Sequence, residues 1–226
     1  MNKALKYVIP LAQTRPSLTG QWRENAWRNV PVATISHFHQ RSSEHRPRVE
    51  AKLTYMPDSL FVFFKVHDRY VRSVHTEFQS SVCLDSCVEF FVEPKPGKGY
   101  LNFEINCGGT LLVYYIEDPT RAEHGFKKYT IIPWEQAQQI QIYHSLPAVV
   151  EPEITEPVEW NIEYRIPFQF IEEYVGPLGA LRGQQWRGNL YKCADQTSHP
   201  HWATWAPLGD KLAFHLPEYF APLHFQ

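Results

Sequence analysis

The sequence predicts an all-β fold: one antiparallel β-sandwich, jelly-roll or immunoglobulin-like, with one short helix, spanning residues 1–226 as a single domain. Its 226 residues allow one large all-β domain or two small ones. Aromatic residues make up 15% of the chain and its 18 prolines are widely spread, which favours short strands and ordered loops over long helices. Apolar and polar residues often alternate, whereas helical periodicity is almost absent.

The expected strands follow from this alternation and from the turn residues between them. Residues 51–55 and 60–68 flank the turn Pro57-Asp58-Ser59 and therefore form a hairpin. Residues 88–93 and 101–107 form a second hairpin around a loop rich in proline and glycine. Further strands are expected at residues 111–116, 140–144, 160–166 and 185–193.

The remaining segments are assigned from their proline, glycine and aromatic residues. Residues 167–175 form the short helix, because a proline stands in its first turn and Gly176 follows its end. Residues 151–157 are acidic and broken by prolines, so we expect an exposed connector. The aromatic segment 214–225 is expected to pack back on the sandwich.

Charge and hydropathy exclude two classes of partner. A net charge of −2 and a pI near 6.6 give no basic face for a nucleic acid. No run of about 18 apolar residues exists, so no membrane span is expected. Residues 1–11 resemble a signal peptide only weakly, since Lys6 interrupts the apolar part and Pro10 breaks it. We expect ordered mature protein there, and the location stays open between the cytoplasm and export by a signal removed before residue 1.

The four cysteines, Cys83, Cys87, Cys107 and Cys193, match no zinc pattern of paired Cys-x-x-Cys units. Buried free thiols are expected, with a disulfide as the alternative.

The second hairpin has a register that its apolar residues select. This register pairs Val92 with Leu101, Phe90 with Phe103 and Val88 with Ile105 on the core face. It then places Glu89 opposite Glu104, together with Asn102 and Asn106, on the other face. Two opposed carboxylates repel each other, so the cluster needs a cation, an arginine, a shared proton or a ligand. Carboxylates and amides suit the hydroxyl groups of a sugar; a solvated outer face is the alternative.

A second set of candidate binding residues lies in residues 191–205, where a strand leads into a loop. Trp202 and Trp205 offer indole faces that stack on the C–H face of a sugar ring, although both could instead fill the end of the core. His199 and His201 have the i, i+2 spacing of a metal pair on a strand, but no third ligand is placed, so the metal content stays unknown.

These stretches resemble a known family. Residues 80–92, 100–109, 191–195 and 198–202 resemble carbohydrate-binding module family 9-like domains. The most specific stretch, Asp85-Ser86-Cys87-Val88-Glu89-Phe90-Phe91, is similar to that family's Asp-x-Val-Glu-x-Phe strand. Trp27, the first hairpin and residues 215–220 extend the resemblance over most of the chain.

The resemblance implies a β-sandwich that grips a terminal sugar, with no cofactor required and with structural calcium nearby. It implies sugar-binding roles for residues of both motif regions: Asp85, Glu89, Asn102, Glu104, Asn106, His199, Trp202 and Trp205. Two features depart from the family. Phe78 is the nearest aromatic residue before Asp85, where a first stacking tryptophan is expected, and Glu104 stands where an arginine is expected.

The leading hypothesis is therefore carbohydrate binding without catalysis, in polysaccharide catabolism and in company with a glycoside hydrolase. One alternative is a glycoside hydrolase that uses Glu89 and Glu104 as paired carboxylates. Another is a haem-binding sandwich, for which Met1 and Met56 are the only methionines. A protein-interaction sandwich with an exposed apolar patch is the third.

Overall fold

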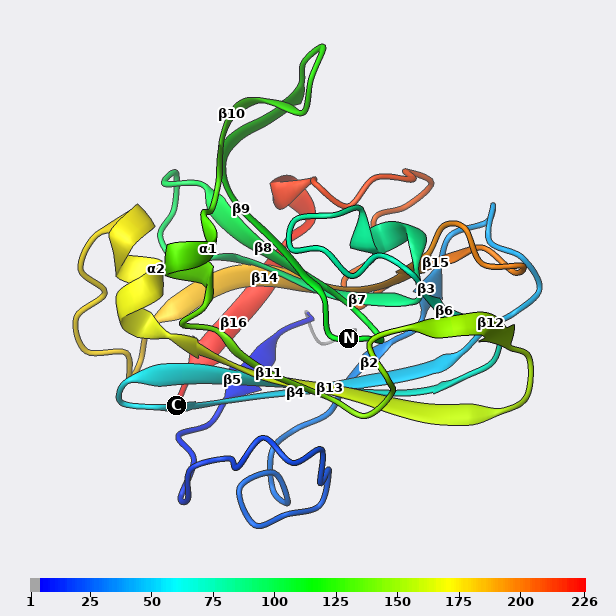
Figure 1. Ribbon diagram of the computed structural model, residues 1–226. Coiled ribbons are helices and arrows are strands. Elements are labelled where there is room, and N and C mark those ends of the chain that lie inside the picture. Colours follow the sequence, from blue (N-terminus) through cyan, green and yellow to red (C-terminus); the bar gives the residue numbers. More distant parts are fainter. Residues whose placement is uncertain (1–4) are drawn as a thin grey trace.

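The computed structural model describes residues 5–226 and contains two β-sheets packed face to face (Figure 1). The expectation of ordered mature protein at the N-terminus falls partly on residues 1–4, which lie outside the described residues. The antiparallel sandwich expected from the sequence is confirmed. None of the helices described is long and apolar enough to cross a membrane.

The larger sheet has nine strands and carries the candidate site. Its main path is β1-β16-β14-β7-β8-β9-β10, with β15 paired to β14 and β3 paired to β15. All its pairs are antiparallel except the parallel pair β1–β16. The strands are β1 (Tyr7–Ile9), β3 (His37–Phe38), β7 (Cys87–Glu93), β8 (Tyr100–Asn106), β9 (Leu111–Arg121), β10 (Phe126–Ile131), β14 (Gln185–Ala194), β15 (His201–Thr204) and β16 (Ala221–Phe225).

The second sheet has five strands in the order β11-β13-β5-β4-β2. These strands are β2 (Ala33–Ile35), β4 (Arg48–Met56), β5 (Ser59–Asp68), β11 (Gln141–His144) and β13 (Val158–Pro167). A separate two-stranded sheet joins β6 (Val71–Ser73) to β12 (Val150–Ile154). The expected connector at residues 151–157 is therefore wrong for its first half, because the backbone of β12 finds a partner in β6 despite Pro152.

Two α-helices interrupt the strands, one more than expected. The helix expected at residues 167–175 is confirmed as α2 (Phe168–Val175), with Pro167 before it and Gly176 after it at a φ of 75°. The second is the single turn α1 (Trp134–Ala137). Short 3₁₀ turns cover Val82–Leu84 and Pro217–Tyr219.

The register expected for the second hairpin is confirmed. Val88, Phe90 and Val92 lie opposite Ile105, Phe103 and Leu101, and all six side chains are buried in the core between the two sheets. The outer face of the large sheet is covered in part by the C-terminal segment, where Phe220 packs with Phe91 and Tyr100. The expectation that this segment packs back on the sandwich is confirmed as well.

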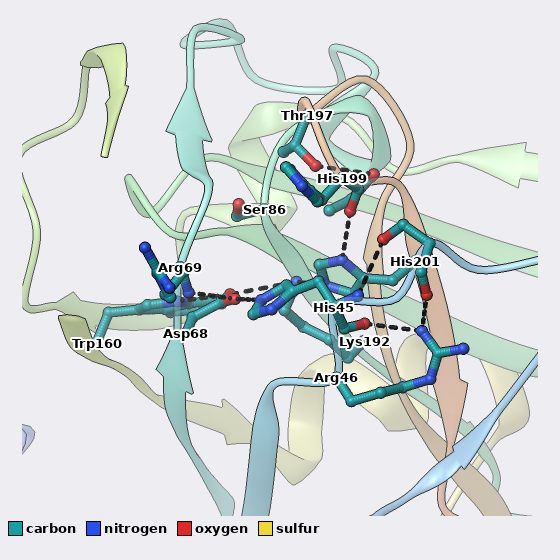
Figure 2. Close-up of polar contacts among 12 residues, drawn as sticks. His45, Arg46, Asp68, Arg69, Ser86, Trp160, Lys192, Thr197, His199 and His201 are labelled. Carbon is teal, nitrogen blue, oxygen red and sulfur yellow. Dashed lines mark hydrogen bonds and ion pairs between the residues drawn. The ribbon is translucent and has the colours of Figure 1, made fainter. Parts of the chain in front are cut away.

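A buried ion pair links the two sheets (Figure 2). Lys192 of β14 points inward, and its Nζ lies 3.6 Å from Oδ2 of Asp68 at the end of β5. Burial alone would raise the pKa of Asp68, but the charge of Lys192 and a hydrogen bond from His45 hold it well below its usual value. This pair fixes the position of β14 over the second sheet.

Candidate functional site

A cavity of about 320 Å³ opens on the outer face of the large sheet. It lies between β7, β8 and β14 on one side and residues 212–215 of the C-terminal segment on the other. Its size falls at the lower end of the range for small-molecule sites. Three carboxylates and two aromatic rings line it, namely Glu89, Glu104, Asp195, Trp202 and Phe214.

The two acids at the base of the cavity are direct cross-strand partners. Glu89 of β7 lies opposite Glu104 of β8, and the two residues are only 2% and 6% exposed. Burial, together with the charge of Glu104, raises the pKa of Glu89 well above its usual value. Burial also raises the pKa of Glu104 to about 7. The pair therefore retains a proton near neutral pH, and this proton relieves the repulsion between the opposed carboxylates.

Neighbouring side chains hold Glu104 in place. The Nδ2 amide of Asn102 donates a hydrogen bond to Oε1 of Glu104 at 2.7 Å, while its Oδ1 accepts the backbone N–H of Tyr114. His215 Nε2 lies 3.8 Å from the same Oε1, and its Nδ1 lies 2.9 Å from the hydroxyl of Tyr100. Burial lowers the pKa of His215 to about 3, so the ring is neutral. If Tyr100 donates to Nδ1, the Nε2 proton faces Glu104.

Trp202 forms one wall of the cavity with its indole ring held in place. Its Nε1 donates a hydrogen bond to Oδ1 of Asp195 at 2.7 Å. The ring is partly exposed, so its face is available for contact. Burial raises the pKa of Asp195, although the bond from Trp202 opposes this effect. An aromatic face beside hydrogen-bonding carboxylates is the combination that a sugar ring requires.

The C-terminal segment and the end of β9 complete the cavity. Phe214 stacks on Tyr191 of β14, with 4.3 Å between ring centroids and 20° between ring planes. Arg121, the last residue of β9, brings the positive charge, and that charge acts to lower the pKa of Glu104. The site thus combines acids, a cation and aromatic rings around one hollow.

The structure brings together part of the site expected from the sequence. Glu89, Glu104 and Trp202 line the cavity, and Asn102 lies behind Glu104. Asp85 and Asn106 are not at the cavity. Oδ2 of Asp85 accepts hydrogen bonds from the backbone N–H groups of residues 74 and 75 and from the amide of Asn106. Oδ2 of Asp85 and both polar side-chain atoms of Asn106 therefore hold the neighbouring loops, whereas Oδ1 of Asp85 has no hydrogen-bond partner among the described residues.

His199 and Trp205 also lie away from the cavity. His199 stacks on Tyr70 at 3.5 Å between ring centroids, beside His201 and the buried pair of Lys192 and Asp68 (Figure 2). Trp205 is 5% exposed and packs in the main core. Neither residue lines the cavity.

Sequence reasoning missed several residues that line the cavity, among them Cys83, Arg121, Asp195, Phe214 and His215. Asp195 could have been found, because it continues the outward-facing alternation of Tyr191 and Cys193 on β14. The others come from a 3₁₀ turn, a loop and a strand end that only the fold brings to this face.

All four cysteines are free thiols, as expected, although Cys83 is only half-buried. Cys87, Cys193 and Glu89 form the group of three potential metal ligands found among residues 5–226. Calcium prefers six to eight oxygen ligands, so a group with two sulfur donors does not fit the structural calcium that the sequence resemblance implies.

Comparisons with known proteins identify the family and the fold. The family model described as carbohydrate-binding family 9 matches residues 25–225. A search of curated proteins gives no match. A candidate carbohydrate-binding protein from Bacteroides uniformis superposes with a TM-score of 0.85 at 24% identity, over 99% of this chain and 100% of that one.

Two further structures are family 9 modules from Caldicellulosiruptor kristjanssonii. The module in complex with cellotriose has a TM-score of 0.66 at 12% identity, over 98% of this chain and 94% of that one. The module in complex with glucose has a TM-score of 0.64 at 12% identity, over 97% and 95% of the two chains. At these identities the likeness establishes a shared fold.

Proposed function

The chain belongs to carbohydrate-binding family 9, a family of non-catalytic binding modules, and on this premise we propose that the cavity beside Glu89 and Glu104 holds a terminal sugar. The observation that carries the proposal is the convergence of Glu89, Glu104, Asp195 and Trp202 on one hollow. Trp202 or Phe214 contacts the apolar face of the ring, and the acids accept hydrogen bonds from its hydroxyl groups.

The size of the hollow favours a chain end over an internal stretch of polysaccharide. A cavity of about 320 Å³ suits one small ligand, whereas internal stretches need a long open groove. The two family 9 modules from Caldicellulosiruptor kristjanssonii hold glucose and cellotriose, and both ligands present a glucose ring. A glucose-type ring is therefore the first candidate for this chain.

The proposed role is to hold the domain on a polysaccharide while a glycoside hydrolase acts on it. A catalytic role for the pair of Glu89 and Glu104 is disfavoured, because family 9 members bind carbohydrate without catalysis. The raised pKa values of both acids suit a binding site that donates as well as accepts hydrogen bonds.

The proposal is tested by calorimetric titration of the purified protein with glucose, cellotriose and a panel of other oligosaccharides. We expect saturable binding of one ligand per chain, weakened about fivefold to tenfold in Trp202→Ala, because stacking on one aromatic ring contributes about 1 kcal/mol. Trp134→Ala is the matched control, since Trp134 is exposed and lies outside the cavity. Absence of binding across the panel, or equal loss in both variants, would contradict the proposal.

A further inference from the structure

We propose that Cys87, Glu89 and Cys193 form a binding site for one thiophilic divalent metal ion of the zinc class. The site lies on the outer face of the large sheet, beside the cavity. The metal site goes beyond carbohydrate binding. It does not require a bound sugar, because three side chains of this chain supply the ligands.

Strand pairing brings the three donor atoms together. Cys87 and Cys193 are direct partners across β7 and β14, and Glu89 follows two residues later on the same face of β7. The two sulfur atoms and a carboxylate oxygen all lie within 4.8 Å of one another. Sγ of Cys193 already approaches Oε1 of Glu89 to 3.1 Å.

These distances are close to those of a metal-bound set. Zinc holds thiolate sulfur at about 2.3 Å and carboxylate oxygen at about 2.1 Å, which separates tetrahedral ligands by roughly 3.5–3.8 Å. Donors that start within 4.8 Å of one another reach this geometry through small side-chain rotations. Rigid strands on both sides keep the donors close before a metal arrives.

The chemistry of the set selects the metal. Two thiolates and one carboxylate favour zinc and related soft cations over calcium or magnesium. On binding, each thiol loses its proton to solvent as a metal–sulfur bond forms, and Glu89 loses its proton as a metal–oxygen bond forms. The two positive charges of the metal then offset two of the three negative charges of the donor set, which lies beside the opposed Glu104.

Access and the fourth ligand come from the cavity. Cys193 and Glu89 both line it, so an ion can enter from solvent and keep a water molecule or another oxygen ligand in its fourth position. Cys107 provides the contrast within the same chain. It is also buried, but its Sγ donates a hydrogen bond to the backbone oxygen of Arg72, and it packs in the main core.

The test uses the full chain, reduced with a phosphine, without sugar, and titrated with Co²⁺ and then with Zn²⁺. We expect one equivalent of Co²⁺ to give sulfur-to-cobalt charge-transfer absorption, which one equivalent of Zn²⁺ abolishes. Cys87→Ser and Cys193→Ser should lose the charge-transfer band, while Cys107→Ser keeps it. Absence of the band in the native protein, or its survival in either of the first two variants, would overturn the proposal.

A second measurement covers the case in which a serine variant fails to fold. Zn²⁺ should raise the melting temperature of the native protein, because it binds the folded state. Glu89→Gln should keep the charge-transfer band but weaken Co²⁺ binding about tenfold or more, since even indirect partners of a metal ligand contribute 10–100-fold. No rise in the native melting temperature overturns the site, and unchanged affinity in Glu89→Gln removes the carboxylate from it.

Discussion

The indole nitrogen of Trp202 donates a hydrogen bond to Oδ1 of Asp195, with 2.7 Å between the two atoms. The bond connects β15 to the residue that follows β14, and it fixes the ring at the wall of the cavity. A ring held in this way loses little conformational freedom when a sugar stacks on it. Besides its proposed contact with the sugar, Asp195 therefore also positions the ring of Trp202.

Asp195→Ala should weaken the binding of the best oligosaccharide ligand about tenfold, because a hydrogen bond to a charged group contributes about 1.5–3 kcal/mol. Asp195→Asn keeps a side-chain oxygen for the indole and should retain most of the affinity. Calorimetric titration of both variants checks this. Equal loss in the two variants would show that the charge of Asp195, and not its bond to Trp202, matters.

Glu104→Gln should stabilise the protein at pH 8. Burial raises the pKa of Glu104 from 4.5 to about 7, so stability falls as pH rises from about 4.5 through 7, where the unfolded state gives up its proton first. Glutamine does not titrate, so the variant should be more stable than the native protein by up to about 3 kcal/mol at pH 8 and by little at pH 4. Urea unfolding in the presence of a chelator measures this difference in the free energy of unfolding. Glu156→Gln, at an exposed position, is the control. The same difference at both pH values would contradict the prediction.

His201→Gln should make stability less sensitive to acid. Burial, with the charge of Lys192, lowers the pKa of His201 to about 3, so the folded ring stays neutral and accepts a hydrogen bond from Lys192 at 2.8 Å. As pH falls from 6.5 towards 3, the imidazole of His201 binds a proton in the unfolded state but not in the folded state. The free energy of unfolding therefore decreases. In the variant, the dependence of the free energy of unfolding on pH should be weaker by up to about 1.4 kcal/mol per pH unit. His215, whose pKa is also lowered, retains its own contribution, and an unchanged slope would contradict the assignment.

Gly188→Ala should destabilise the sheet by about 1–3 kcal/mol, in the range of overpacked sites. A Cβ at this position would lie 2.6 Å from the backbone oxygen of Phe91, where β14 pairs with β7. Thermal unfolding measures the effect. Gly179→Ala, which meets open space and carries only the strain of its φ of 68°, should cost less.

The register of β7 and β8 could be predicted from the sequence because six apolar residues can face the core in one register only. That register placed Glu89 opposite Glu104 and so located the base of the cavity. The prediction uses the alternation of apolar and polar residues, because successive side chains of a strand point to opposite faces of the sheet.

Trp205 and His199 do not line the cavity, for two different structural reasons. Residues three apart in an extended segment point to opposite faces, and Trp205 directly follows β15, so Trp202 and Trp205 do not share a wall. Ala203 and Trp205 point into the core, while Trp202 points outward. His199 precedes β15, and its stacking on Tyr70 depends on a contact between distant segments.

Phe214, His215 and Arg121 were out of reach for a different reason. They reach the cavity through the path of residues 206–220 across the sheet and through the length of β9. No local pattern encodes these positions, because they depend on the packing of the aromatic residues beneath them.

The central claim is that the hollow between β7, β8 and residues 212–215 is the carbohydrate site. A crystal structure of the protein with cellotriose tests it most directly. We expect the terminal ring against Trp202 or Phe214, with its hydroxyl groups within hydrogen-bonding distance of Glu89, Glu104 or Asp195. Cellotriose bound elsewhere on the surface, with this hollow filled by water alone, would contradict the account.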